Sequence, residues 1–229
     1  MISIKDLTVA YGFNTVLHNI NLSISSGEIY GIVGLNGAGK TTLFNTIYGI
    51  KTPLSGSIKY NDSKISKKDI TFLETENYYF SHITGYEYLS LFVKDIQIIN
   101  EWNKLFNLPL DELIDTYSTG MRKKISILSV ITQKKPLLIL DEPFNGLDLQ
   151  SSRTLSVIIK ELSKNRTIII SSHILETVIN ICSTICYLKN GVVESIWDKN
   201  SFHLIEEKIF SVLDSENLSL IRDLIGQKH

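Results

Sequence analysis

A chain of 229 residues can bury a full hydrophobic core, as one large domain or as one domain with an inserted subdomain. Its formal net charge of -1 gives no overall attraction to nucleic acid, which argues against a DNA-binding or RNA-binding protein. The apolar runs fall short of the roughly 20 residues that cross a bilayer, and the first residues do not resemble a secretory signal, so we expect a cytoplasmic chain.

The first part of the chain has the pattern of half-buried strands. Apolar and polar residues alternate over residues 2–9 and 20–24, which predicts two antiparallel strands. Tyr11 and Gly12 form a turn between them that carries an exposed aromatic ring. Further strands are expected over residues 29–33, 57–60 and 70–73.

A glycine-rich loop joins the apolar run at residues 29–33 to a helical pattern. Glycines in this loop let the backbone approach a polyphosphate, and the N–H groups of the loop and of the following helix converge on it. Lys40 then reaches the outer phosphates, and the Thr41 hydroxyl is placed to bind Mg²⁺. The pattern G-x-x-x-x-G-K-[ST] predicts a site for a nucleoside triphosphate with Mg²⁺, formed by Gly34, Asn36, Gly37, Ala38, Gly39, Lys40, Thr41 and Thr42.

Helical periodicity dominates from about residue 78 to residue 135, where helices are expected over residues 85–93, 98–106 and 119–131. Strands and helices then alternate, which is typical of a parallel sheet with helices on both faces. These later elements are expected over residues 137–140, 149–162, 167–170, 174–181 and 185–188.

The order of these patterns predicts an α/β fold in a single domain. Residues 1–77 and 136–205 form a P-loop NTPase core with an N-terminal antiparallel β-subdomain, and residues 78–135 form a helical insertion. Residues 206–229 form a C-terminal tail that contains one more amphipathic helix.

Two carboxylates follow the apolar strand at residues 137–140. At the carboxyl edge of the sheet, Asp141 can hold Mg²⁺ and Glu142 can polarise an attacking water. His173 ends the next predicted strand at the same edge, where ligands gather in open parallel sheets, so we expect it to contact the γ-phosphate and the water.

These motifs, in this order, resemble the nucleotide-binding domain of an ABC transporter over nearly all of residues 1–194. Residues 34–41 are similar to the Walker A motif, residues 137–142 to the Walker B motif, and residues 145–148 to the D-loop, which ends at Asp148. The resemblance implies that His173 is the switch histidine and that adenine stacks on Tyr11.

The signature motif of the family, usually L-S-G-G-Q, is represented by residues 117–121, Tyr-Ser-Thr-Gly-Met. Ser118 and Gly120 are kept, whereas the first glycine and the glutamine are replaced. In this family the motif caps the γ-phosphate of ATP held by another subunit. The resemblance therefore implies a head-to-tail dimer, with ATP and Mg²⁺ bound between two copies or between this chain and a related subunit.

A second departure concerns the glutamine that family members carry after the strand preceding the helical insertion, where it touches Mg²⁺. Thr75 aligns with that position and is the expected metal contact. Glu74 or Glu76 replaces it if the loop is shifted by one residue.

The resemblance also implies separate transmembrane permease subunits that dock near residues 75–87, so the chain would lie on the inner face of the cell membrane. The variant signature and residues 83–87 are similar to those of bacterial exporters of drugs, antimicrobial peptides or lipid-linked polymers. We expect ATP hydrolysis that powers transport, in the direction of export.

Two other functions compete with transport. One is an ABC-type ATPase that acts on ribosomes or DNA, although such proteins usually carry two joined domains or long coiled coils. The other is a P-loop kinase for a small molecule, which would need neither the signature serine nor a dimer.

Overall fold

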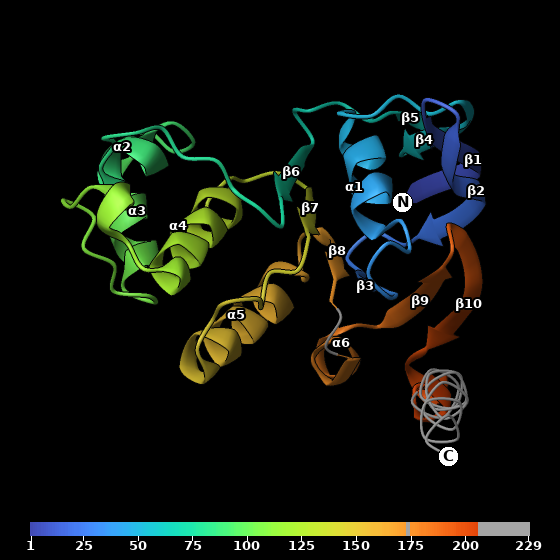
Figure 1. Ribbon diagram of the computed structural model, residues 1–229. Helices are drawn as coiled ribbons and strands as arrows, with labels where there is room; N and C mark the ends of the chain where they lie inside the picture. Colours follow the sequence, from blue (N-terminus) through green and yellow to red (C-terminus); the bar gives the residue numbers. More distant parts are fainter. Residues whose placement is uncertain (173–174, 206–229) are drawn as a thin grey trace, which may run out of the picture.

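The computed structural model describes residues 1–172 and 175–205 (Figure 1). The predicted tail and His173 lie outside the described residues. The strands are β1 (Ile2–Tyr11), β2 (Asn14–Ile24), β3 (Ile29–Val33), β4 (Ser55–Tyr60), β5 (Ser63–Lys64), β6 (Ile70–Leu73), β7 (Leu137–Leu140), β8 (Thr167–Ser171), β9 (Thr184–Lys189) and β10 (Val192–Asp198). The helices are α1 (Lys40–Tyr48), α2 (Gly85–Ser90), α3 (Ile96–Asn103), α4 (Thr119–Ile131), α5 (Leu149–Leu162) and α6 (Leu175–Ile181), with single 3-10 turns η1 (Ile114–Thr116) and η2 (Lys199–Ser201).

The N-terminal strands form an antiparallel sheet in the order β2-β1-β4-β5, at the right of Figure 1. Both strands of its first hairpin are longer than the sequence pattern predicts, because pairing continues until Tyr11 lies opposite Asn14. The turn therefore consists of Gly12 and Phe13, and Gly12 has a φ of 59° that suits glycine.

The second sheet has the strand order β10-β9-β3-β8-β7-β6. All neighbours are parallel except β10, which returns along β9 through a turn at Asn190 and Gly191. Because β8 lies between β3 and β7, the carboxyl ends of these three strands meet at one edge. The phosphate loop, Asp141 and Ser171 are brought together there.

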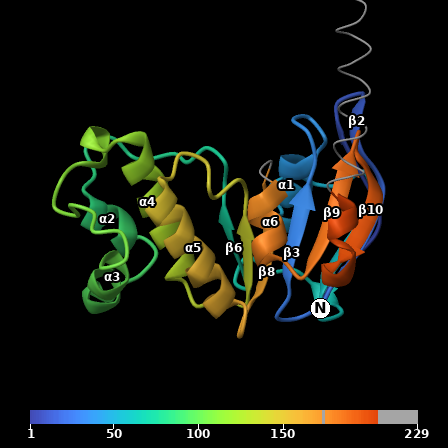
Figure 2. The same cartoon turned by 90° about the horizontal axis from the view of Figure 1, so that it is seen from below.

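The parallel strands of the second sheet are buried on both faces, and the side chains of β7 alternate between two cores. Leu137 and Ile139 belong to the core that α1 and the antiparallel sheet cover. Leu138 and Leu140 belong to the core that α4, α5 and α6 cover. Figure 2 shows α4 and α5 beside β6, and α6 overlapping β8 and β3 in that view. This two-sided burial explains why β7 is a continuous apolar run.

Helix α4 and helix α5 have the predicted bounds, whereas α3 begins and ends earlier than predicted. The Asp95 side chain accepts a hydrogen bond from the Gln97 N–H and starts α3. The Asn103 side chain ends it by bonding both backbone groups of Leu108. Helix ends that are set by side-chain hydrogen bonds of this kind cannot be predicted from the spacing of apolar residues.

The observed sheets and helices confirm the expected α/β fold with an antiparallel β-subdomain. Helices α2, α3 and α4 form a group that lies beyond β6 and far from the antiparallel sheet in Figure 1. Over the described residues, we find no helix with both the length and the apolar character that a membrane span requires.

Candidate nucleotide-binding site

The loop between β3 and α1 is shaped by glycines. Gly39 has a φ of 106°, which other residues rarely adopt. A Cβ on Gly34 would lie 2.3 Å from the Leu188 carbonyl oxygen, and one on Gly39 would lie 2.6 Å from the Leu17 side chain. Backbone atoms and not side chains therefore form the surface of the loop at these positions. A phosphate-binding loop requires this, because its backbone N–H groups must come close to the phosphate.

A cavity of about 620 Å³ opens over this loop, a volume typical of ligand-binding clefts. Among the residues predicted from the sequence, the structure places these around the cavity: Gly34, Asn36, Gly37, Ala38, Gly39, Lys40, Thr41, Thr42, Thr75, Asp141 and Glu142. Neither Glu74 nor Glu76 lines it.

The Lys40 side chain is folded back over the loop. Its Nζ donates hydrogen bonds to the Gly34 carbonyl oxygen at 2.7 Å and to that of Leu35 at 3.3 Å. The same Nζ lies 3.9 Å from Glu142 Oε1, and both side chains are largely buried. A positive charge is thus held where a phosphate chain would enter.

Hydroxyl and carboxylate oxygens meet at the floor of the cavity. Thr41 Oγ1 donates a hydrogen bond to Asp141 Oδ2 at 2.8 Å, and Ser171 Oγ donates one to the other carboxylate oxygen. Hard oxygen donors of this kind suit Mg²⁺, which binds one or two protein groups and takes its remaining ligands from water and phosphate. In the described chain no cluster of three or more His, Cys, Asp or Glu side chains offers a complete protein cage. The residues present fit a magnesium ion that is shared with a nucleotide.

Glu142 follows Asp141 in an unusual conformation. Its φ is 48°, and its N–H donates a hydrogen bond to Ser171 Oγ at 2.9 Å. A non-glycine residue with positive φ is strained, and such strain is common at functional sites. This conformation keeps the Glu142 side chain at the cavity although it belongs to the turn after β7.

The signature residues lie apart from the cavity of their own chain. Ser118 is exposed and caps α4, because its Oγ accepts a hydrogen bond from the Met121 N–H at 3.3 Å. A Cβ on Gly120 would lie 3.2 Å from the Gly146 carbonyl oxygen, so α4 begins directly against the loop that leads to Asp148.

Asp148 caps α5 and joins it to α4. Its carboxylate accepts hydrogen bonds from Lys124 Nζ at 2.9 Å and from both the N–H and the hydroxyl of Ser151. The hydrogen bond from Lys124, followed by those from Ser151, lowers the pKa of Asp148 well below its usual value. Asp148 therefore keeps its negative charge on this exposed surface.

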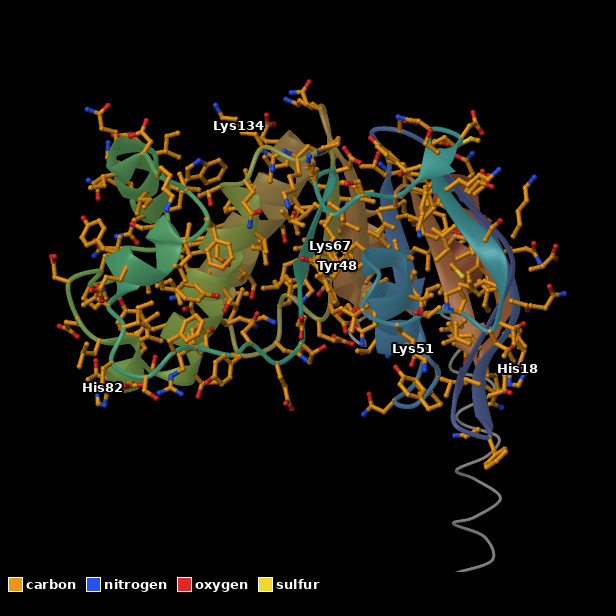
Figure 3. The ribbon with its side chains drawn as sticks, turned by 90° about the horizontal axis from the view of Figure 1, so that it is seen from above. His18, Tyr48, Lys51, Lys67, His82 and Lys134 are labelled. Atoms are coloured by element: carbon orange, nitrogen blue, oxygen red, sulfur yellow. The ribbon has the colours of Figure 1, made fainter. Side chains whose placement is uncertain are left out.

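Tyr11 lies at the end of β1 and is about half exposed, at 47 %. The Lys51 ammonium stands 4.3 Å from the centre of its ring, a cation–π distance, and Figure 3 labels Lys51 beside α1. Tyr11 is not among the residues that line the cavity, whereas Val16 of the same hairpin is.

Sequence reasoning missed the roles of two serines at the site. Ser171 binds both Asp141 and the backbone of Glu142, and its sequence signal was a hydroxyl at the end of an apolar strand. Ser172, the next residue, lines the cavity.

The fold and the cavity define a P-loop nucleotide-binding protein with a helical insertion. The model of the ABC transporter family matches residues 17–145, more than half of the chain. The chain belongs to the ABC transporter family, as an ATP-binding subunit that hydrolyses ATP.

Relatives are similar over most of the chain. The bacitracin transport ATP-binding protein BcrA of Enterococcus faecalis is 32% identical over 95% of this chain and 72% of its own length. The lantibiotic transport ATP-binding protein SrtF of Streptococcus pyogenes is 32% identical over 84% of this chain and 89% of its own. A solved ATP-binding subunit of an ABC transporter superposes with a TM-score of 0.82 at 26% identity, covering 96% of this chain and 99% of that one.

Proposed function

We propose that this chain powers the export of a peptide antibiotic or a related amphipathic compound through separate transmembrane subunits. The relatives BcrA and SrtF, which are named for the transport of bacitracin and of a lantibiotic, support this cargo class. The same relatives give no support to an ATPase acting on ribosomes or DNA, or to a small-molecule kinase.

One observation carries the proposed mechanism: the cavity holds Lys40, Thr41, Asp141 and Glu142, while exposed Ser118 lies outside it on the same chain. A second ATP-binding subunit, placed head to tail, brings its Ser118, Gly120 and Asp148 to the open side of the nucleotide. ATP then binds two subunits together. To change such a pair from mostly open to mostly closed, ATP must favour the closed form by about 5 kcal/mol.

Each residue of the proposed site has its own role. The loop N–H groups and Lys40 bind the phosphates, and Tyr11 stacks on adenine. Thr41 and Asp141 hold Mg²⁺, with Thr75 as a further ligand, and the ion neutralises charge on the outer phosphates when it is bound. Glu142 accepts a proton from the attacking water, and His173 contacts the γ-phosphate and orients this water.

The permease subunits dock on the segment from Thr75 to Glu87, which places the chain on the inner face of the membrane. Tyr78 and Phe80 of this segment are mostly exposed, and their rings meet edge to face with centroids 5.9 Å apart. Exposed aromatic patches of this kind typically mark protein contacts.

The test is the Glu142→Gln variant, purified with its membrane subunits and saturated with Mg-ATP. Without the base it should bind ATP, hydrolyse it at least roughly a hundredfold more slowly, and trap the closed pair, seen by cross-linking between ATPase subunits. The matched control adds Ser118→Arg, which should keep ATP binding and lose closure. Subunits that stay apart in the Glu142→Gln complex would contradict the proposal.

A further inference from the structure

The proposed docking segment is joined by its backbone to the residues that lead to the signature. The hydrogen bonds run from the Ile114 N–H to the Ile83 carbonyl oxygen at 2.9 Å, from the Gly85 N–H to that of Glu112 at 3.2 Å, and from the Tyr86 N–H to that of Leu110 at 2.9 Å. The 3-10 turn η1 then connects residues 110–114 to Tyr117, the first residue of the signature. A displacement of the docking segment is therefore passed to the residues directly before Ser118.

Gly85 packs against the signature itself. A Cβ on Gly85 would lie 2.6 Å from the Tyr117 hydroxyl oxygen and 3.0 Å from the Leu110 Cα. Tyr117 is buried, and its hydroxyl donates a hydrogen bond to the Pro109 carbonyl oxygen at 2.7 Å. Only a residue without a side chain leaves room for this contact between the two segments.

Tyr79 connects the docking segment to the signature helix α4. Its hydroxyl donates a hydrogen bond to the Arg122 carbonyl oxygen at 2.7 Å and shares a second hydrogen bond with Ser126 Oγ. The ring packs against buried Tyr88 of α2, with centroids 5.2 Å apart. The hydroxyl is thus held against the first turns of the helix that Ser118 caps.

Asp115 makes a further link between the same two parts. Its carboxylate accepts a hydrogen bond from the His82 N–H at 2.9 Å, and its carbonyl oxygen accepts one from Arg122 Nη2 at 2.8 Å. His82 has a φ of 59°, a conformation that is costly for a residue other than glycine. Figure 3 labels His82 in the helical group, away from the antiparallel sheet. Asp115 therefore holds the docking segment and α4 together through one residue.

These contacts lead to a different nucleotide from the one that Thr75 serves. Thr75 lines the cavity of its own chain, so a signal that passes through it acts on the chain's own ATP. The contacts of Tyr79 and Asp115 lead instead to the start of α4 and to exposed Ser118. In the proposed pair, Ser118 faces the nucleotide of the opposite subunit.

We propose that Tyr79 and Asp115 are positioning residues through which docked membrane subunits set the place of Ser118, and so control hydrolysis of the ATP that the opposite subunit holds. The inference rests on the proposed transport function and adds a route by which docking is felt at the site. Neither residue touches the nucleotide; both act through α4.

The experiment measures the stimulation ratio, which is the phosphate release rate of the assembled transporter divided by that of the isolated chain. Tyr79→Phe removes the hydroxyl and keeps the ring, and Asp115→Ala removes the acceptor of the His82 N–H. Each variant should lower the ratio roughly fivefold, the effect of losing one hydrogen bond between two coupled parts. The dissociation constant of ATP from the isolated chain, measured by calorimetry, should change by less than about twofold, because the cavity is untouched.

Two controls separate positioning from general stability and from weaker docking. Thr132→Val removes a hydroxyl that bonds the Leu128 carbonyl oxygen at 2.6 Å near the other end of α4, and it should keep the ratio. Asp115→Asn keeps an oxygen that can accept the His82 N–H and should restore most of the ratio. The amount of each variant that co-purifies with the membrane subunits should equal that of the wild type, because Asp115 lies outside residues 75–87 and the Tyr79 ring is retained.

A wild-type ratio in both Tyr79→Phe and Asp115→Ala overturns the inference. So does an equal fall in Thr132→Val, or a loss of ATP affinity in the isolated variants that matches the fall in the ratio. The proposed transport function fails separately, in the wild type, if membrane subunits do not stimulate its hydrolysis at all.

Discussion

Tyr11 is the residue on which we propose that adenine stacks, and it lies outside the residues that line the cavity. Lys51 covers its ring at 4.3 Å, and the ring has further exposed surface for stacking. In this proposal the cation on one face of the ring holds the ring in the orientation that stacking needs.

Tyr11→Ala should therefore weaken ATP binding by about 1 kcal/mol, the usual contribution of an aromatic stack. Calorimetric titration with ATP measures the change. Phe13→Ala is the matched control, because Phe13 is a fully exposed aromatic residue two positions away in the same hairpin. Equal affinity losses in the two variants, or none in either, would remove Tyr11 from the site.

Single residues of the site could be predicted from the sequence where the chemistry needs particular residue types next to one another in the chain. Gly39, Lys40 and Thr41 are consecutive in the chain, so their roles can be predicted from the sequence pattern without a structure. The role of Ser171 could not be predicted in this way, because its partners Asp141 and Glu142 lie 30 and 29 positions earlier in the chain. Only the parallel pairing of β7 with β8 brings these groups together.

At the scale of elements, the proposed mechanism gives Ser118 at the beginning of α4 a second function beside helix capping. Ser118 accepts a hydrogen bond from the Met121 N–H and so stabilises the helix. The remaining N–H groups of the first turn are open to an anion, as at any helix N-terminus. The proposed contact with the partner's γ-phosphate uses this second property.

Substitutions at Ser118 can separate the two functions. Ser118→Ala should lower the free energy of unfolding by about 1 kcal/mol, because alanine cannot cap a helix. Ser118→Asp should keep the stability, since aspartate caps as well as serine, but it should block ATP-driven closure by repelling the phosphate. Urea unfolding measures the first effect and cross-linking of the pair the second. An aspartate variant that closes normally would exclude Ser118 from the interface.

Element bounds were predictable where burial is periodic and unpredictable where side chains bond to backbone. Helices α4 and α5 have the predicted bounds because their apolar faces are continuous. Helix α3 was placed wrongly because Asp95 and Asn103 set its ends. The first hairpin was predicted too short, because an irregularity between Leu17 and Ile20 places two exposed residues in succession and interrupts the alternation of buried and exposed side chains.

At the scale of the whole molecule, strand order creates the site. Three strands that are far apart in the sequence, β3, β7 and β8, end side by side and bring together the phosphate loop, Asp141 and Ser171. Alternation of strands and helices predicted a parallel sheet, but not that β8 would lie between β3 and β7. Such neighbours are decided by packing between distant segments, which local patterns do not encode.

Thr75 lines the cavity just after β6, and residues 75–84 lead from it to α2. In the proposed alignment Thr75 takes the place of a glutamine that touches Mg²⁺ and couples ATP to the membrane partner. The side chain of threonine is shorter than that of glutamine and carries no amide group. In the proposed mechanism it therefore couples partner docking to hydrolysis weakly.

Thr75→Gln should raise the hydrolysis rate that the membrane subunits stimulate, while the rate of the isolated chain stays within about twofold, because the longer side chain acts only when a partner positions the loop. The phosphate release rate of the assembled transporter, with and without its membrane subunits, measures this difference. Glu74→Gln and Glu76→Gln are the controls for register, since neither residue lines the cavity, and neither variant should increase the stimulation. A gain at Glu74 or Glu76 instead of Thr75 would show that the loop shifts by one residue when the permease docks, and it would remove Thr75 from the proposed metal ligands.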